Sequence, residues 1–149
     1  MKRISLILLL GIATVFAACE KDDANTEGID LSNTLEPYIE FTSTSAKQVK
    51  QGTATTVGFQ MRTGLQQKVT VHYDVTGAVN LPNQTLVLDR EATTGQATIN
   101  IPANVIVAPA TSATATVTLK RAVKEDGTEL TLGAKNQPAS QVVTLNIIP

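Results

Sequence analysis

Tryptophan is absent from this 149-residue chain, and cysteine and histidine occur once each. A single cysteine excludes a disulfide bond within the chain. A tetrahedral zinc site would have to be built from the one histidine and carboxylates, because the one cysteine is assigned another role below. The chain also lacks a glycine-rich phosphate loop and a dinucleotide-binding fingerprint. These absences remove thiol, zinc and nucleotide chemistry from the function classes worth considering.

An excess of positive charge is missing as well. The chain has 12 Lys and Arg against 13 Asp and Glu. Removal of residues 1–18, argued below, would take Lys2 and Arg3 with it and leave 10 basic residues against 13 acidic ones, a net charge of about −3. Nothing resembles the basic patch that a nucleic-acid-binding protein needs. Beyond the amino terminus, no apolar stretch approaches the roughly 18 residues of a membrane-spanning helix.

The amino terminus has the parts of a bacterial lipoprotein signal. Lys2 and Arg3 supply positive charge, an apolar stretch covers residues 4–16, and two alanines, the second of them Ala18, directly precede Cys19. The apolar stretch of 13 residues is too short to span a hydrocarbon core of about 30 Å as a helix. We therefore predict cleavage of residues 1–18 between Ala18 and Cys19 and lipidation of the Cys19 thiol. The alternative is an ordinary secretory signal with a small residue near the cut.

Residues 19–36 are polar and acidic and offer few side chains to bury. Such a stretch cannot offset the entropy of ordering it, so we predict a flexible linker. Lys21, Asp22 and Asp23 follow the cysteine closely and resemble the export tag of Bacteroidota surface lipoproteins. The resemblance implies an anchor in the outer membrane and a domain exposed at the cell surface. The alternatives are a linker that is acidic for solvation alone and an anchor that faces the periplasm.

From residue 37 onward, apolar and polar residues alternate with a period of two. The clearest run places Val71, Tyr73 and Val75 on one side of a strand and His72 on the other. Successive strand residues point to opposite faces, so each such run has one apolar and one polar face. Valine and threonine dominate, and both suit a pleated, half-buried surface. No stretch has a convincing helical period, and residues 37–149 are predicted to form one all-β domain.

Turn signals separate the expected strands. Asp126–Gly127 is the strongest, because a type I′ turn needs positive φ at both central residues and this dipeptide tolerates it. Thr94–Gly95 is a second turn signal, and residues 102–111 are expected to form a short strand or a packed crossover. Seven or eight strands favour an immunoglobulin-like antiparallel two-sheet sandwich, with a closed barrel as the weaker alternative. The strands are predicted at residues 38–43, 53–62, 68–76, 84–89, 96–101, 113–123, 128–132 and 141–148.

Most of this domain resembles Calx-β-like and related immunoglobulin-like modules. The resemblance is carried by residues 68–75, 97–102, 113–119, 130–134 and 142–147. It implies the sandwich fold. In the members of that family that bind calcium, acidic loop residues supply the oxygen ligands, and the nearest counterparts here are Glu40, Glu125 and Asp126. Because three scattered acids fall short of the six to eight oxygens that Ca²⁺ takes, we expect no metal site and no cofactor.

No set of residues nominates a catalytic site. His72 and Asp74 lie on the same face of one expected strand, about 6–7 Å apart along it, so an exposed ion pair is feasible. A catalytic triad would need a nucleophile that nothing in the sequence singles out. The acids do not form a recognisable glycosidase pair. We therefore predict that the protein is not an enzyme.

Aromatic side chains, on which sugars stack, make up only 3% of the chain. Phe59 and Tyr73 fall in the apolar phase of their strands and are expected in the core, which leaves Tyr38 or Phe41 for the surface. One ring is a poor platform. We predict a non-catalytic, membrane-anchored lipoprotein that contacts protein partners in the cell envelope, as an adhesion module or an accessory of an outer-membrane complex. The alternative is a small glycan-binding lipoprotein of a polysaccharide-uptake system.

Overall fold

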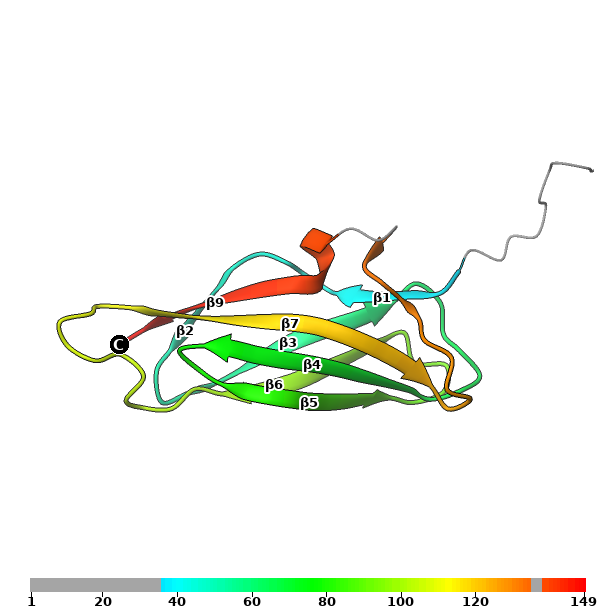
Figure 1. Cartoon of the computed structure of the whole chain (residues 1–149), viewed down its shortest axis with the longest axis horizontal. Helices are drawn as coiled ribbons and strands as arrows, with labels where there is room; N and C mark the ends of the chain where they lie inside the picture. Colours follow the sequence, from blue (N-terminus) through cyan, green and yellow to red (C-terminus); the bar gives the residue numbers. More distant parts are fainter. Residues whose placement is uncertain (1–35, 135–137) are drawn as a thin grey trace, which may run out of the picture. The chain divides into compact units, whose positions relative to one another are not determined.

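A computed structural model describes residues 36–134 and 138–149 of the chain (Figure 1). Glu36–Pro149 forms a compact unit with its own hydrophobic core. Besides strands, the described part contains a short 3-10 helix, η2 (Pro138–Gln141), and none of its helices is long and apolar enough to cross a membrane. The strands are β1 (Tyr38–Phe41), β2 (Lys47–Lys50), β3 (Ala54–Met61), β4 (Val69–Gly77), β5 (Leu81–Leu88), β6 (Thr94–Asn100), β7 (Ala113–Lys124), β8 (Thr131–Leu132) and β9 (Val142–Ile148).

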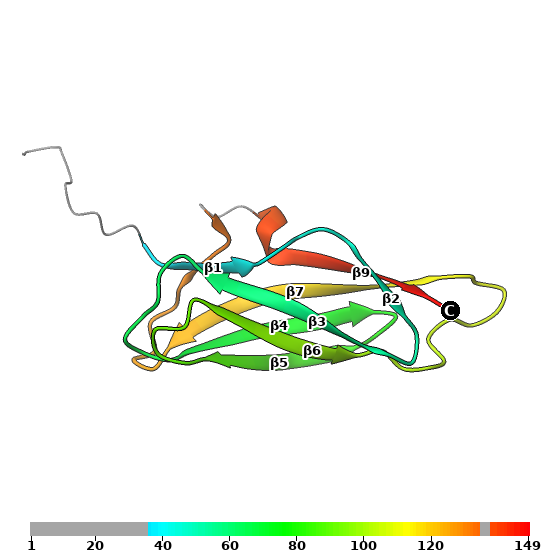
Figure 2. The same cartoon turned by 180° about the vertical axis from the view of Figure 1, so that it is seen from behind.

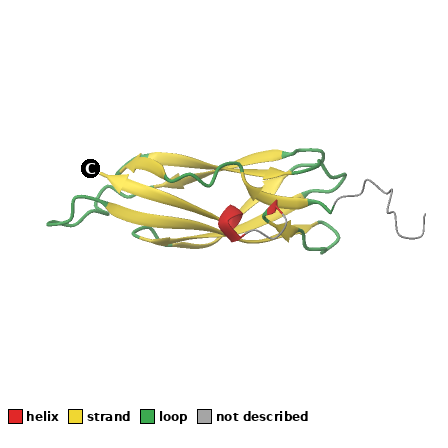
Figure 3. Ribbon diagram, turned by 90° about the horizontal axis from the view of Figure 1, so that it is seen from above, coloured by secondary structure: helices red, strands yellow, loops and turns green. Residues whose placement is uncertain are grey.

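The strands form two facing sheets, which Figure 3 shows as two layers seen from above. One sheet has the strand order β6-β3-β1-β8, and the other has the order β2-β9-β7-β4-β5. Each strand with the predicted alternation directs its apolar side chains into the space between the sheets; β4, for example, alternates between buried and half-buried residues. The predicted immunoglobulin-like two-sheet sandwich is confirmed.

The sheets are mixed rather than wholly antiparallel. β1 runs parallel to β8, and β2 runs parallel to β9, while the other pairs of neighbouring strands are antiparallel. Both parallel pairs arise because the segment from β1 to β2 leaves one sheet and joins the other. This crossing is visible from behind in Figure 2, where β1 and β2 lie at opposite ends of the sandwich. The sequence predicted one strand at residues 38–43 and no strand at β2, so the crossing between sheets was not predicted.

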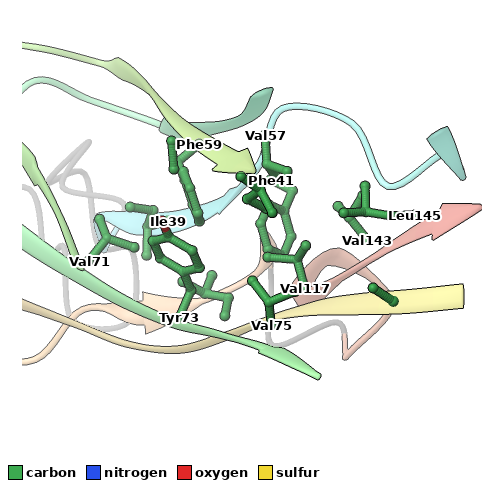
Figure 4. Packing of buried hydrophobic residues seen from close by; sticks show 14 of the residues in the cluster. Ile39, Phe41, Val57, Phe59, Val71, Tyr73, Val75, Val117, Val143 and Leu145 are labelled. Carbon is green, nitrogen blue, oxygen red and sulfur yellow. The ribbon is translucent and has the colours of Figure 1, made fainter. Parts of the chain in front are cut away.

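The core is built around three aromatic rings from both sheets (Figure 4). Phe41 and Phe59 are register partners in β1 and β3, and their ring centroids lie 4.9 Å apart. The Phe59 ring is also 5.4 Å from that of Tyr73 on β4 in the facing sheet. Phe59 therefore connects the two layers. Burial of a ring of this size contributes roughly 3–5 kcal/mol relative to alanine, so these contacts hold the sheets in register.

One predicted turn is wrong, and a second is present but has a different type. Thr94–Gly95 belongs to β6, where both residues pair with β3, and the chain turns earlier, at residues 89–93. The Asp126–Gly127 turn exists but is not type I′, because Gly127 has a φ of +85° and Asp126 does not have positive φ. The Gly127 N–H donates to the Lys124 carbonyl at 2.9 Å. This is the pattern of a three-residue hairpin loop that ends in a left-handed glycine.

Residues 102–111 form a packed crossover between β6 in one sheet and β7 in the other. They contain no strand. Val105 and Ile106 pack against the core, while Val107 is 73% exposed. The crossover therefore closes one end of the sandwich with apolar side chains and leaves an apolar residue at its surface.

Candidate functional site

The predicted lipidation site and export tag, comprising Ala18, Cys19, Lys21, Asp22 and Asp23, lie outside the described residues. The signal peptide, the cleavage and the anchor therefore stay predictions. The described domain begins at Glu36, which lines a pocket together with Lys124 and Glu129. The chain that leads back toward Cys19 thus joins the sandwich at the end where β7 finishes.

That end of the sandwich carries most of the ion pairs in the described residues, and we call it the charged end. It comprises residues 62–68, 89–93 and 124–130. Lys68 Nζ lies 3.0 Å from Asp89 Oδ1, and Arg90 Nη2 lies 3.1 Å from Glu125 Oε2. The side chains of both pairs are between 43% and 77% exposed, so each pair is solvated and screened.

Asp126 is the most extensively bonded acid at the charged end. Its carboxylate accepts a hydrogen bond from the Thr128 N–H at 2.8 Å and another from the Gln67 side chain at 2.9 Å, and it lies 3.2 Å from Lys124 Nζ. These donors, first the Thr128 backbone and then Gln67, hold the pKa of Asp126 well below its usual range. The carboxylate is therefore committed to the hairpin rather than available as a ligand.

The opposite end has no acidic or basic residue in its loops, and we call it the neutral end. It comprises residues 51–53, 77–80 and 101–112. The Gln51 N–H donates to the Ile148 carbonyl at 2.8 Å, and the Gln51 side-chain oxygen accepts from the Ile106 N–H at 3.4 Å. The charge-free sequence extends well beyond these loops, from residue 92 to residue 119. It takes in the whole of β6 and the first half of β7.

His72 and Asp74 do not form a site. His72 is half-buried on the outer face of β4, and its register partners are Thr85 and Arg121. Asp74 accepts a hydrogen bond from the Asn83 N–H at 2.8 Å and lies 3.9 Å from Lys120 Nζ. The carboxylate is therefore occupied by a backbone donor and a lysine rather than by the histidine.

The acids compared with calcium ligands each have their own hydrogen-bond or ion-pair partners. Glu40 on β1 accepts from the Gln60 side chain at 2.8 Å and from the Ala134 N–H at 3.3 Å, far from the pairing of Glu125 with Arg90. In residues 36–134 and 138–149, no group of three or more His, Cys, Asp or Glu side chains could hold a metal ion. The expectation that the protein binds no metal stays a prediction.

The aromatic side chains of the domain offer little to a sugar. Phe41, Phe59 and Tyr73 are buried, and Tyr38 is half-buried. The prediction that Phe59 and Tyr73 lie in the core is confirmed, and burial raises the pKa of Tyr73. Exposure of Phe41, one of two alternatives from the sequence, is wrong because the whole of β1 pairs with β3 and turns this ring inward.

A pocket of about 250 Å³ opens at the charged end. Its walls include Lys124, Glu129 and Leu130. Sites for drug-sized ligands usually occupy about 300–1,000 Å³ and are mainly apolar. This pocket is smaller, and its lining mixes opposite charges, so it is a weak candidate for a small-molecule site.

The sheet edges differ sharply in how they are protected. β8 has only two residues, and β2 has four, with Lys47 and Lys50 at its ends. β5 contains Pro82, positive φ at Asn83, and a register shift in its pairing with β4. Short length, lysine, proline and bulges are the devices that keep edge strands from pairing with other chains. β6 has seven residues, an unbroken register with β3, and neither charge nor proline. It is the candidate interaction site.

Neither a protein-family model nor a curated protein matches the sequence. Solved structures do match. The crystal structure of the apo-form Calx CBD1 domain has a TM-score of 0.57 at 10% identity and covers 76% of this chain and 97% of that one. The crystal structure of CBD12 from CALX1.2 has a TM-score of 0.56 at 10% identity and covers 74% of this chain and 43% of that one. The chain therefore has a Calx-β-like fold.

Proposed function

We propose that this protein is a non-catalytic lipoprotein of the outer membrane, anchored through Cys19 and displayed at the cell surface, whose β-sandwich contacts protein partners. The observation that carries the proposal is the unprotected edge of β6. A free edge strand presents a row of backbone donors and acceptors that an extended partner strand can pair with. The burial of Phe41, Phe59 and Tyr73 favours this mode over glycan binding, since among residues 36–134 and 138–149 it leaves Tyr38, itself half-buried, as the one ring that a sugar could reach.

The mechanism is pairing under confinement. An anchor on Cys19 would hold the domain at the membrane and raise its effective concentration for neighbours there to the millimolar range. At such a concentration, weak contacts between strand edges would suffice to bind a partner. Glu36, at which the described domain begins, lies at the charged end beside Lys124 and Glu129.

The anchor is tested by Cys19→Ala in the full chain. Acylation should be lost, and the protein should move from the outer-membrane fraction to the soluble fraction. Incorporation of a labelled fatty acid and fractionation measure the two effects. A variant that stays in the outer membrane would show that Cys19 does not carry the anchor.

Partner binding is tested by a pull-down of carboxy-terminally tagged protein from gently solubilised membranes. We compare the natural chain with Thr98→Pro, which removes one outward donor of β6, and with Thr98→Val, which keeps it. Proline is tolerated at an edge where its missing N–H would face solvent. Partners retained by the natural chain and by Thr98→Val, but lost by Thr98→Pro, support recognition through β6. Partners that Thr98→Pro retains in full would place recognition elsewhere.

A further inference from the structure

The hydrogen-bonding groups on the free side of β6 follow from its register. The Ile101 N–H donates to the Thr53 carbonyl, and the Met61 N–H donates to the Thr93 carbonyl, so residues 93 and 101 bond to β3. Backbone groups alternate direction along an antiparallel strand. The residues of β6 that point both N–H and C=O away from β3 are therefore Thr94, Gln96, Thr98 and Asn100. Their side chains are exposed as well.

We infer that the partner strand for this edge is β6 of a second copy of the same chain, paired antiparallel about a two-fold axis. The inference rests on the proposed function, whose unnamed partner it identifies. A register that sets residue 94 opposite 100, and 96 opposite 98, uses all four outward residues on both chains. Each such pair exchanges two hydrogen bonds. The two four-stranded sheets then join into one continuous sheet.

Side chains suit this register on both faces. On the outer face, Gln96 meets Thr98 and Thr94 meets Asn100, which are uncharged pairs that can hydrogen-bond across strands. On the inner face, Ala97 meets its own copy at the axis, where a small side chain avoids a clash. The remaining inner pair sets Gly95 opposite Ile99 of the other copy.

The surroundings of Gly95 favour an apolar neighbour. A Cβ placed on Gly95 would overlap with a terminal methyl carbon of Leu88 and would lie 3.1 Å from one of Leu86, and both leucines belong to β5. These two leucines therefore cover the inner side of the edge at this position. Ile99 of the second copy would lie next to them and would extend the core of one sandwich toward the other. β5, which is itself uncharged, would approach its own copy alongside.

Charge selects a second copy over a charged partner strand. A two-fold axis brings each surface residue near its own copy, so any charge close to the axis meets a like charge. The chain has none between residues 92 and 119. The nearest charges before β6 are Arg90 and Glu91. In antiparallel pairing they lie beyond Asn100 of the other copy, beside its neutral end, whose loops contain no acidic or basic residue.

The inference is tested by sedimentation of residues 20–149, which contain the compact unit 36–149 with its own core. Concentrations should extend to about 1 mM, the effective concentration that a tether supplies. We expect a reversible dimer. Thr98→Pro should raise its dissociation constant about tenfold or more, while Thr98→Val leaves it within about threefold, because only the proline removes hydrogen bonds from both copies. Thermal unfolding of both variants checks the monomer fold.

Gln96→Lys provides a second test that keeps every backbone donor, in case the proline variant fails to fold. It places lysines near each other across the axis and should also weaken the dimer about tenfold, and more at low salt. Thr114→Lys, at an exposed position on central β7, is the matched control and should leave the dimer unchanged. A dimer that Thr98→Pro and Gln96→Lys leave intact would place the interface elsewhere and overturn the inference.

Amide hydrogen exchange tests the proposed register between the two copies of β6. As the dimer forms, the N–H groups of residues 94, 96, 98 and 100 should become protected, whereas those of 95, 97 and 99, already bonded to β3, should not change. A chain that remains a single copy at about 1 mM overturns self-pairing. If the pull-down from membranes still recovers partners that are lost with Thr98→Pro, the proposed function remains supported although self-pairing is wrong.

Discussion

At both ends of this sandwich, loops are held together by polar contacts, but the two ends use different groups. At the charged end, loops are joined by side chains, as in the 3.0 Å pair of Lys68 with Asp89 and the 3.1 Å pair of Arg90 with Glu125. At the neutral end, loops are joined mainly through the backbone, as in the 3.0 Å hydrogen bond from the Gly52 N–H to the Ile101 carbonyl. Ion pairs between loops are thus a feature of the charged end, because the loops of the neutral end contain no acidic or basic residue.

This difference determines what each end responds to. Exposed ion pairs contribute about 0–1 kcal/mol each, and salt screens them. Backbone hydrogen bonds and left-handed glycines do not depend on ionic strength in this way. The charged end should therefore be sensitive to salt and pH but tolerant of substitution, and the neutral end should be the reverse. Each prediction below compares the two.

The largest contrast is expected between two glycines with similar backbone angles. Gly77 at the neutral end has a φ of +96°, and a Cβ there would lie 2.7 Å from the Thr114 carbonyl oxygen. Gly77→Ala therefore adds a backbone collision to the strain of a left-handed alanine. We expect a loss of about 3 kcal/mol in the free energy of unfolding, measured by urea denaturation.

Gly127 at the charged end is the matched control. Its φ is +85°, but a Cβ there meets nothing within 4 Å. Gly127→Ala should carry only the conformational strain, about 1–2 kcal/mol. Equal losses for the two variants would mean that the neutral end relaxes around the added methyl group, and that it tolerates substitution as well as the charged end does.

The sequence predicts inward and outward residues well, because alternation is a local property of one strand. Val71, Tyr73 and Val75 are buried as predicted. Prediction from the sequence fails where a segment becomes a strand only because it pairs with a distant neighbour. β2 has a single apolar residue, Val49, among lysines and glutamine, and it is a strand because it pairs with β9, far along the chain. No local pattern contains that information.

The same limit applies to the candidate site. Gly95 suggests a turn by residue type, yet it lies within β6, where a terminal methyl carbon of Leu88 occupies the space of a Cβ. That β6 lies at an edge also depends on the order of all four strands in its sheet. Its uncharged composition is readable from the sequence, but its exposure is not. The predicted lipid anchor is the opposite case, since the prediction of lipidation at Cys19 uses local sequence alone.

A smaller effect is expected from the ion pair of Arg90 with Glu125. A double-mutant cycle of Arg90→Ala and Glu125→Ala should give a coupling of about 0.5 kcal/mol at low salt. The coupling should vanish near 1 M salt, where the Debye length is about 3 Å. The difference in the free energy of unfolding between Gly77→Ala and the natural chain should not change over the same range of salt concentration. A coupling that survives 1 M salt would mean that the pair is more shielded from solvent than its exposure indicates.

The smallest and most local effect concerns acid pH at the Asp126 hairpin. The pKa of Asp126 is held well below its usual range by the Thr128 N–H and the Gln67 side chain. A group with a lowered folded-state pKa contributes stability above its unfolded pKa of about 3.9 and loses it as pH falls through the folded value. Asp126→Asn keeps an acceptor for Thr128 but has no carboxylate to titrate.

The melting temperatures of the natural chain and Asp126→Asn should therefore differ by a constant amount above about pH 5 and converge as the pH falls below about 4. Gln67→Ala, which removes one donor, should raise the pKa of Asp126 part of the way toward its usual range, as measured by NMR titration of the carboxyl group. Gly77→Ala serves as the control at the neutral end, because it changes no titrating group. The decrease in melting temperature that it causes should therefore not depend on pH over this range. Convergence seen for Gly77→Ala as well would mean that the acid response belongs to the whole sandwich and not to its charged end.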